Sequence, residues 1–481
     1  MCVGFYIKSI LVHNILFLFI TYLRTYVYFS TMNIESFLNE ICKSFNNHIT
    51  DDKILEYKTH HKKLKIPLKY IIFYKFLNSF MLKDQSVELI NEYIDYSRSC
   101  FYEQEKQISL EYFSDLNDNI CKICNKYLSN LFPKTSNNFY EPIIVDGVYS
   151  NEKDYKPCLN LGFYDLIKNV PICIDYYGTE NRNNEHGSLK QFISENLNYF
   201  SNKILVLDRG YFKYEIINFL IEHNIKFIIR YKGESGNLNS NLLKNYKNFK
   251  IRSIRLNNIA DKDIKIYPKY KRDKTNGILC KTRIRDDCVL ITNLSNHFKN
   301  DLIFDLYKKR WDIESYFKLV KGNFNFQHLT GKEKIEIQKQ FLCINIMCSI
   351  CKVINHLTIN NFKKEHKKSI SEFLIINCNQ SKILRFIQNI FLKKIFTTEK
   401  CNFEIIKNSI KKYVEIRKYE KDRSYPRICK TPYLKWHLKG YSDKSEITKI
   451  LRAIINDTVN NLNDNLKSKS KHIKILKQIK L

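Results

Sequence analysis

Acidic residues are scarce in this chain of 481 residues. Aspartate and glutamate together number 49, against 80 lysines and arginines, which leaves a formal net charge of +31. An excess of this size favours a polyanionic partner, and nucleic acid is the most common one. Glycine is also scarce, at 12 residues, and a coding sequence rich in A and T would itself favour such a composition. The charge therefore suggests nucleic acid without deciding the matter.

The cysteines lack the spacing of a zinc site or of a disulfide framework. Fifteen are scattered over the chain, and two pairs have the CxxC spacing, Cys121/Cys124 and Cys348/Cys351. A structural zinc site needs four ligands, usually from two such pairs close together, and these pairs lie far apart. We interpret both pairs as core cysteines, the second in the apolar run CINIMCSIC, which is typical of a buried helix. A reducing compartment follows from this usage.

The first 31 residues are apolar but lack the features of a signal peptide. Residues 4–29 are interrupted by Lys8, His13 and Arg24, so the uninterrupted part is shorter than the about 20 residues that a membrane span takes. No small-residue cleavage site is evident. Because Met32 opens an ordinary domain sequence, we expect 1–31 to lie upstream of the true start. A membrane anchor is the weaker alternative, and we do not expect a membrane partner.

The remaining chain divides into three regions by its pattern. Apolar residues spaced by three and four predict a helical N-terminal domain over 32–139, which either binds DNA ends or only packs on the core. Residues 140–365 predict an α/β core, interrupted by a β-rich insertion at 233–300. Residues 366–481 are basic and predicted helical, and their Lys-rich tail is either solvated or holds the DNA backbone.

Two aspartates follow predicted strands of the core. The predicted order is β-β-β-α-β-α-β, with Asp146 just past the first strand, in PIIVDG, and Asp208 just past the fourth, in KILVLDRGY. Polar residues at the carboxyl ends of buried strands are where α/β folds place their sites. Asp175, in the third strand, is the alternative to Asp146. We prefer Asp146 because the opening strand lies centrally, beside the fourth, in this strand order.

A later segment carries a carboxylate among cations. Residues 307–321, YKKRWDIESYFKLVK, predict a helix on which Tyr307, Arg310, Glu314 and Lys321 lie within about 60° of each other. This charged row runs along the edge of a core-facing stripe formed by Leu306, Ile313, Phe317 and Val320. Glu314 is therefore expected at the rim of a packed surface. The alternative is a surface helix with i,i+4 ion pairs, each worth only a few tenths of a kcal/mol.

Asp146, Asp208 and Glu314 together indicate phosphodiester chemistry. Asp312 is a poorer candidate because it points away from the charged row. Three carboxylates can hold two Mg²⁺ ions, which activate a water or a 3′-hydroxyl and stabilise the leaving oxygen of an in-line displacement. The cations beside Glu314 suit the phosphates of the substrate rather than the metals.

These motifs resemble those of insertion-sequence transposases of the DDE class. The most similar group is the insertion sequence four family, whose signature is Tyr, two residues, Arg, three residues, Glu, six residues, Lys. The segment 307–321 matches that spacing at every signature position. VDG at 145–147 and DRGY at 208–211 resemble the two aspartate motifs, and the β-rich insertion matches the family's layout. The resemblance covers about residues 142–330.

The resemblance implies an α/β, RNase H-like mixed-sheet catalytic core that cleaves transposon ends and transfers the strands into target DNA. The implied cofactor is a pair of Mg²⁺ ions, with Mn²⁺ as a substitute. The implied catalytic and metal-binding residues are Asp146, Asp208 and Glu314. The residues assigned to DNA binding are Tyr307, Arg310, Lys321, Arg209 and Lys318. The expected partner is double-stranded DNA, bound by a homodimer inside the cell, in a prokaryotic nucleoid or a eukaryotic nucleus.

The cleavage pathway and two other functions stay open. Relatives that form a hairpin at the transposon end stack a displaced base on a tryptophan of the insertion. Here the two tryptophans, Trp311 and Trp436, both lie outside 233–300, and Tyr267 or Tyr270 would have to take that role. The alternative functions are a domesticated DNA-binding protein without catalysis and a metal-dependent nuclease without strand transfer.

Overall fold

The computed structural model describes the greater part of the chain. The described residues are 34–50, 53, 56–57, 64–80, 83–132, 140–151, 157–181, 184–231, 263–266, 278–285, 288–326, 329, 333–366, 374–396 and 408–418. The predictions for the leader 1–31, Tyr267, Tyr270, Trp436 and the Lys-rich tail fall outside these ranges.

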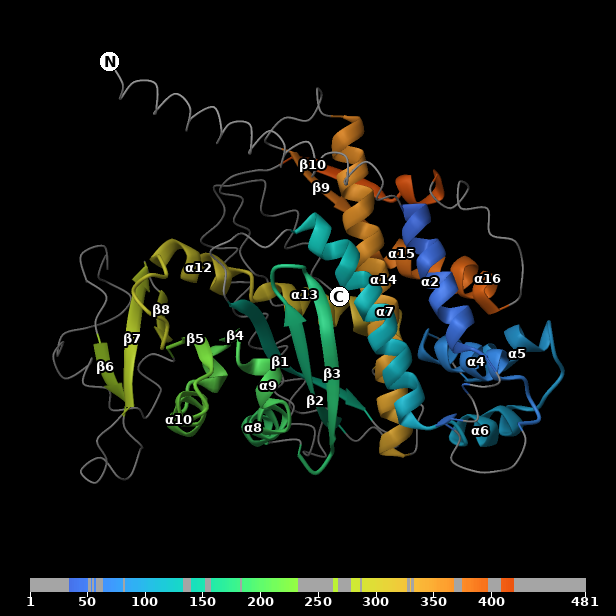
Figure 1. The fold of residues 1–481 in the computed structure, drawn as a ribbon, viewed down its shortest axis with the longest axis horizontal. Helices are drawn as coiled ribbons and strands as arrows, with labels where there is room; N and C mark the ends of the chain where they lie inside the picture. The colour runs from blue at the N-terminus through green and yellow to red at the C-terminus, as the bar shows by residue number, and fades with distance from the viewer. Residues whose placement is uncertain are drawn as a thin grey trace, which may run out of the picture. The chain divides into compact units, whose positions relative to one another are not determined.

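An eight-stranded mixed sheet organises the described part of the chain, in the order β3-β2-β1-β4-β5-β8-β7-β6 (Figure 1). Its strands are β1 (Glu141–Asn151), β2 (Pro157–Asp165), β3 (Val170–Gly178), β4 (Lys203–Leu207), β5 (Lys226–Arg230), β6 (Asp263–Ile266), β7 (Ile278–Arg285) and β8 (Cys288–Thr292). β1 runs parallel to β4, and β4 parallel to β5, whereas β2 is antiparallel to β1. The predicted mixed α/β class is confirmed, and the first and fourth strands are neighbours as predicted.

The described strands of the stretch 233–300 continue this same sheet. β8 pairs antiparallel with β5, and β7 and β6 follow it outward. β-branched and other apolar residues fill the inner strands, and β4 is buried along its whole length. The predicted insertion therefore adds strands to one side of the central sheet.

Helices cover both faces of the sheet. One face packs on α8 (Glu185–Glu195), α9 (Leu197–Phe200) and α10 (Tyr214–Glu222) through an apolar cluster that includes Ile143 and Val145. The other face shares a second, larger core with the N-terminal helices and with α12 (Asn300–Lys308) and α13 (Trp311–Asn323). The N-terminal helices are α2 (Ile34–His48), α4 (Leu68–Phe80), α5 (Lys83–Asn91), α6 (Arg98–Lys106) and α7 (Leu110–Leu131). These helices therefore pack on the core, and whether they also bind DNA stays a prediction.

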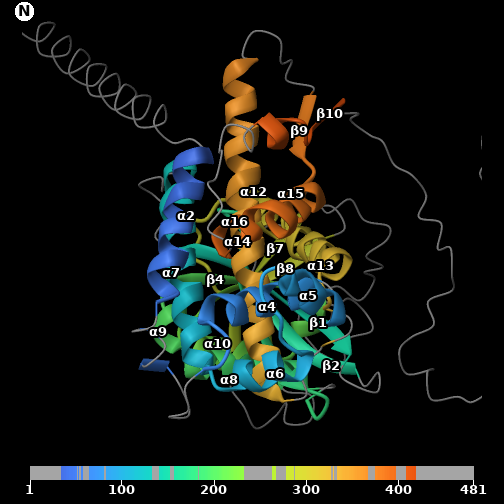
Figure 2. The same ribbon diagram turned by 90° about the vertical axis from the view of Figure 1, so that its right-hand side faces the viewer.

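The helix α14 (Lys334–Glu365) crosses this second core and contacts both α7 and β3 (Figures 1 and 2). By length and composition alone α14 could span a membrane, but 83% of its most apolar stretch is buried inside the protein, as in the core helix of a soluble protein. Cys348 and Cys351 are buried within it, as predicted for core cysteines. The other CxxC pair lies on α7, with Cys124 buried and Cys121 half-buried.

The described part of the C-terminal region is not purely helical. It contains α15 (Gln380–Phe386), a π-helical turn η4 (Ile387–Phe391) and α16 (Leu392–Phe396). It also contains a two-stranded sheet of β9 (Leu374–Cys378) and β10 (Val414–Lys418). In β10 the apolar Val414 and Ile416 alternate with charged residues, which is the period of a strand, and β9 is a short apolar run; a helical interpretation overlooked both.

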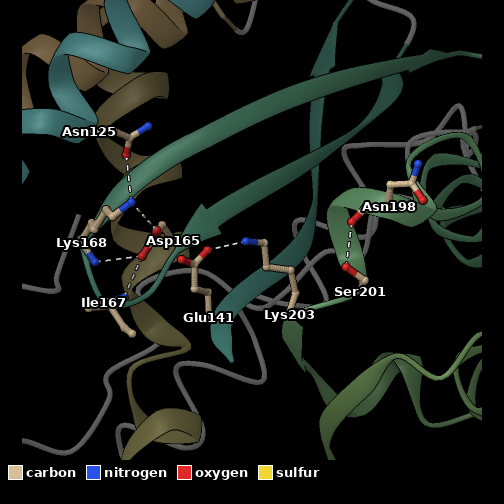
Figure 3. Close-up of polar contacts among 8 residues, drawn as sticks. All are labelled: Asn125, Glu141, Asp165, Ile167, Lys168, Asn198, Ser201 and Lys203. Atoms are coloured by element: carbon tan, nitrogen blue, oxygen red, sulfur yellow. Dashed lines mark hydrogen bonds and ion pairs between the residues drawn. The ribbon is translucent and has the colours of Figure 1, made fainter. Parts of the chain in front are cut away.

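Polar contacts fix the ends of the strands that carry the site (Figure 3). Lys203, at the start of β4, forms an ion pair with Glu141, at the start of β1. The predicted tight turn between β2 and β3 is present, and Asp165 accepts the backbone N–H groups of Ile167 and Lys168 within it. The Lys168 side chain then reaches Asn125 of α7 at 3.1 Å. The register of β1, β2 and β4 is therefore held at this end of the sheet.

Candidate active site

The pairing of β1 and β4 brings Asp146 and Asp208 together. Ile144 and Val148 belong to the core that includes α13, so the alternation of a strand points Asp146 to the same face. The last parallel partners are Val145 and Leu207, and Asp208 follows directly after β4. The two aspartates are thus neighbours at the point where this parallel pairing stops.

The predicted end of the first strand at Asp146 was wrong. β1 continues to Asn151 because it pairs with β2 along its whole second half, from Asp146 opposite Gly162 to Asn151 opposite Pro157. Only the parallel pairing with β4 ends at Val145. Asp146 therefore lies inside a strand, where β4 no longer covers its edge.

The predicted helix over 307–321 is two helices. α12 ends at Lys308 and α13 begins at Trp311, and the join is a tight turn in which the Arg310 N–H donates to the Tyr307 carbonyl at 3.0 Å. The four signature residues therefore do not share one helical face. Tyr307 and Arg310 are both buried, rather than lying at a rim, whereas Glu314 is half-buried as expected.

A glycine on β2 lets α13 approach the sheet closely. A Cβ atom on Gly162 would lie 2.5 Å from Cε1 of Phe317. Because Gly162 is the partner of Asp146 in the β1–β2 ladder, the Phe317 ring rests beside the aspartate's strand. Glu314 lies one helical turn before Phe317, so the same contact brings its carboxylate toward Asp146.

Arg310 lies among the three predicted carboxylates. Its Nη2 donates to Glu314 Oε1 at 2.9 Å, its Nη1 lies 3.9 Å from Asp146 Oδ2, and its Nε lies 3.8 Å from Asp208 Oδ1. The arginine side chain is only 7% exposed, whereas the carboxylates are 24–37% exposed. A single guanidinium therefore brings together carboxylates from β1, from the turn after β4 and from α13. The i,i+4 ion pair with Glu314 exists, but it is part of a larger, half-buried group of charges.

The charged groups of this site shift one another's pKa values. Burial raises the pKa of Asp146 to about 7, and the charges of Glu185 and Asp208 add to the rise while Arg310 opposes it. Burial acts to lower the pKa of Arg310, but Asp208, Tyr307 and Glu314 outweigh it, so the net shift is upward. Arg310 thus stays charged. Burial lowers the pKa of Lys321, and the charge of Asp146 partly opposes this shift, which places Lys321 in the same field.

Sequence reasoning missed a fourth carboxylate, Glu185. Glu185 is the first residue of α8. A Cβ atom on Gly147 would lie 2.7 Å from Cδ of Glu185, so the glycine leaves space for the Glu185 carboxylate. The hydroxyl of buried Tyr211 donates to Glu185, and His186 Nε2 lies 2.9 Å from the Gly210 carbonyl oxygen. These contacts hold α8 against the turn after Asp208. A glutamate in the first helical turn is common, so the sequence offered no distinguishing signal.

The other predicted residues lie at varying distances from this group. Tyr307 is buried, its hydroxyl has no hydrogen-bond partner among the described residues, and burial with the Asp208 charge raises its pKa to about 12. Arg209 is exposed directly beside Asp208. Lys318 is exposed on α13, one helical turn after Glu314, and lines a cavity that none of the three carboxylates lines. Asp175, the alternative to Asp146, lies on β3 and is separated from β1 by β2.

The donor set suits a hard divalent cation. Carboxylate oxygens are the ligands that Mg²⁺ prefers, and Asp146, Asp208 and Glu314 supply them around one positive centre. Within the described ranges, no three His, Cys, Asp or Glu side chains are gathered closely enough to hold a metal ion as they stand. The reason is geometric, because the guanidinium of Arg310 lies between the carboxylates.

One protein-family model matches the segment of the chain that contains the three carboxylates. The family model described as the transposase DDE domain matches residues 143–350. That segment begins in β1, ends in α14 and includes all three carboxylates, and the match supports a DDE transposase. No curated protein sequence matches the chain.

One solved structure with a similar chain is the piggyBac transposase in a synaptic complex with hairpin DNA. The identity is 11%, the TM-score is 0.35, and the match covers 89% of this chain and 88% of that one. A TM-score this low does not establish a shared fold.

Proposed function

We propose that this protein is a DNA transposase of the insertion sequence four family with an RNase H-like core, which cleaves transposon ends and joins them to target DNA. The observation that carries the proposal is the convergence of Asp146, Asp208 and Glu314 on Arg310, inside the segment that matches the transposase DDE domain. The strand order β3-β2-β1-β4-β5, with β2 antiparallel, is compatible with such a core.

Asp146, Asp208 and Glu314 would hold the metal ions. Bound Mg²⁺ would activate the attacking water or 3′-hydroxyl and stabilise the leaving oxygen of the phosphodiester. Arg310 offsets part of the negative charge of the three carboxylates and keeps them close together without metal. For its proposed contact with DNA phosphate, the guanidinium must turn away from the carboxylates, and the phosphate then replaces them as its anionic partner.

The exposed and half-exposed cations would bind the DNA backbone. Arg209 follows Asp208 and Lys321 lies in the field of Asp146, so both are near the reacting phosphate. Glu185 would act on Asp146 through its charge, and Tyr211 fixes its position. The large positive charge of the chain supports double-stranded DNA as the partner. A homodimer in the DNA complex is part of the same proposal.

Cleavage and joining assays test this function. The substrate is a duplex with the sequences that flank the reading frame of the element, incubated with Mg²⁺ or Mn²⁺. We expect wild-type protein to cut this duplex and to join a pre-cut end to a second DNA. Asp146→Asn and Asp208→Asn should lower cleavage by orders of magnitude and leave DNA binding intact, whereas Asp175→Asn should cleave normally.

Each other outcome identifies a different function or site. Cleavage without joining identifies a nuclease, and DNA binding without metal-dependent cleavage identifies a binding protein. If Asp175→Asn abolishes cleavage and Asp146→Asn does not, the assignment of the first aspartate is wrong.

A further inference from the structure

A cavity of about 900 Å³ lies along a different face of α13 from the carboxylates. Its walls come from α13, α14, the end of α7 and the segment that joins β9 to α15. Cavities of this size hold drug-sized ligands and are several times larger than a single phosphate ion needs. The lining is mixed, with apolar side chains beside many amides and cations.

The cavity wall contains a buried lysine that forms no close ion pair. Lys352 is 5% exposed, and within the described chain it forms no close ion pair or hydrogen bond. Its Nζ lies 5.6 Å from the centroid of the Tyr164 ring, and the charge of Asp312, on α13, acts on it without an ion pair. Burial lowers the pKa of Lys352. Lys318 and Lys363 also line the cavity, against one carboxylate, Glu415, which accepts a hydrogen bond from Asn379. A buried charge costs free energy unless an anion pairs with it, so this wall is suited to an anionic ligand.

Two further polar atoms beside Lys352 have no partner within the described structure. Asn355 is 5% exposed, and its Oδ1 makes no hydrogen bond. The Nε2 atom of His356 is also buried without a partner. Both residues line the cavity, three and four positions after Lys352 on α14, so the three side chains share one face of the helix. These atoms can bind polar groups of a ligand that also pairs with the lysine.

The rest of the lining suits a nucleobase better than an inorganic anion. Phe132 forms part of the wall, with its ring 5.0 Å from that of His356, and offers an aromatic face on which a base can stack. Side-chain amides donate and accept hydrogen bonds, as base edges do. Besides Asn355, the amides of the lining are those of Asn169, Asn323, Asn360, Asn377, Asn379 and Gln380.

We propose that this cavity binds a nucleotide, with the phosphate at Lys352 and the base between Phe132 and the amides. The nucleotide is either a free nucleoside phosphate or one unit of a DNA strand, since both have the same phosphate and base. The proposal does not depend on the catalytic role of the three carboxylates.

Calorimetric titration of the full chain tests this site. The probes are 2′-deoxyadenosine 5′-monophosphate, deoxyadenosine, inorganic phosphate and a short single-stranded DNA with a 5′-phosphate. We expect the monophosphate or the DNA to bind, and the nucleoside and inorganic phosphate to bind much more weakly. The Lys352→Met variant should weaken binding about 10- to 100-fold, the loss expected for a charge-assisted contact.

Lys339→Met is the matched control, because it removes a second buried lysine of α14. Lys339 is paired with Glu105 at 3.5 Å, so its loss should lower stability and leave nucleotide binding unchanged. Lys352→Met should fold about as stably as wild type, since it removes a buried charge that forms no close ion pair, at the cost of its attraction to Asp312. Competition between the monophosphate and the DNA strand then identifies the source of the nucleotide. The proposal is overturned if neither binds, if inorganic phosphate binds as tightly as the monophosphate, or if Lys352→Met binds like wild type.

Discussion

Arg310→Ala should destabilise the metal-free protein and increase the stability that the protein gains when a divalent metal binds. The substitution removes the cation that lies 2.9 Å from Glu314 and 3.8–3.9 Å from the two aspartates. Removing one partner of a fully buried ion pair costs about 3–5 kcal/mol. The carboxylates are 24–37% exposed, and solvent screens part of their repulsion. We therefore expect a loss of about 1–3 kcal/mol in chelator.

Denaturant unfolding with and without Mg²⁺ measures this effect. Divalent metal should restore more stability to Arg310→Ala than to wild type, because no guanidinium then competes for the carboxylates. Arg209→Ala is the control, since Arg209 is an exposed cation beside Asp208 and should cost less than about 0.5 kcal/mol. The reasoning is refuted if Arg310→Ala is as stable as wild type in chelator, or if Mg²⁺ stabilises both proteins equally.

Three further predictions concern the packing and charge of the same site. Gly162→Ala should cost about 1–3 kcal/mol of unfolding free energy in denaturant, because the new Cβ atom meets Phe317. Gly322→Ala is the control and should be neutral or stabilising, because the space around its Cβ atom is open. In chelator, Asp146→Asn should become progressively more stable than wild type as the pH rises from about 4 to about 7. The raised pKa of Asp146 keeps this carboxyl group protonated in the folded state, whereas in the unfolded chain it ionises over this pH range, which destabilises only wild type. The pH dependence of the difference in unfolding free energy checks this, and a flat difference would contradict it. Glu185→Gln should lower the pKa of Asp146, followed by the carboxyl ¹³C shift, and an unchanged titration would show that the Glu185 charge does not act there.

The sequence predicted the elements of this core because their periodicity is strong. The strands over 157–165 and 170–178, the tight turn between them and the neighbouring first and fourth strands all follow from short apolar runs and turn residues. The convergence of Asp146 and Asp208 followed from the same pattern, since each aspartate directly follows the last residue of its strand that pairs in the parallel ladder.

Tertiary contacts decided what the sequence could not show. β1 passes beyond Asp146 because β2 pairs with it, and no residue near Asp146 signals that pairing. The turn at Arg310 contains neither proline nor glycine, and the arginine stays buried because carboxylates from distant strands surround it. Glu185 joins the group only because α8 packs against the turn after β4. The hydrogen bond from Tyr211 to Glu185 holds that packing in place.

The central claim is that Glu314 acts with the two aspartates in metal-dependent cleavage of DNA. The most direct measurement is single-turnover cleavage, in Mg²⁺, of the duplex with the flanking sequences, by wild type, Glu314→Gln and Asp312→Asn. Asp312 and Glu314 lie two residues apart on α13, and of these two acids only Glu314 forms an ion pair with Arg310. We predict a loss of several orders of magnitude for Glu314→Gln with DNA binding retained, and a near wild-type rate for Asp312→Asn. Cleavage by Glu314→Gln at the wild-type rate would contradict the claim.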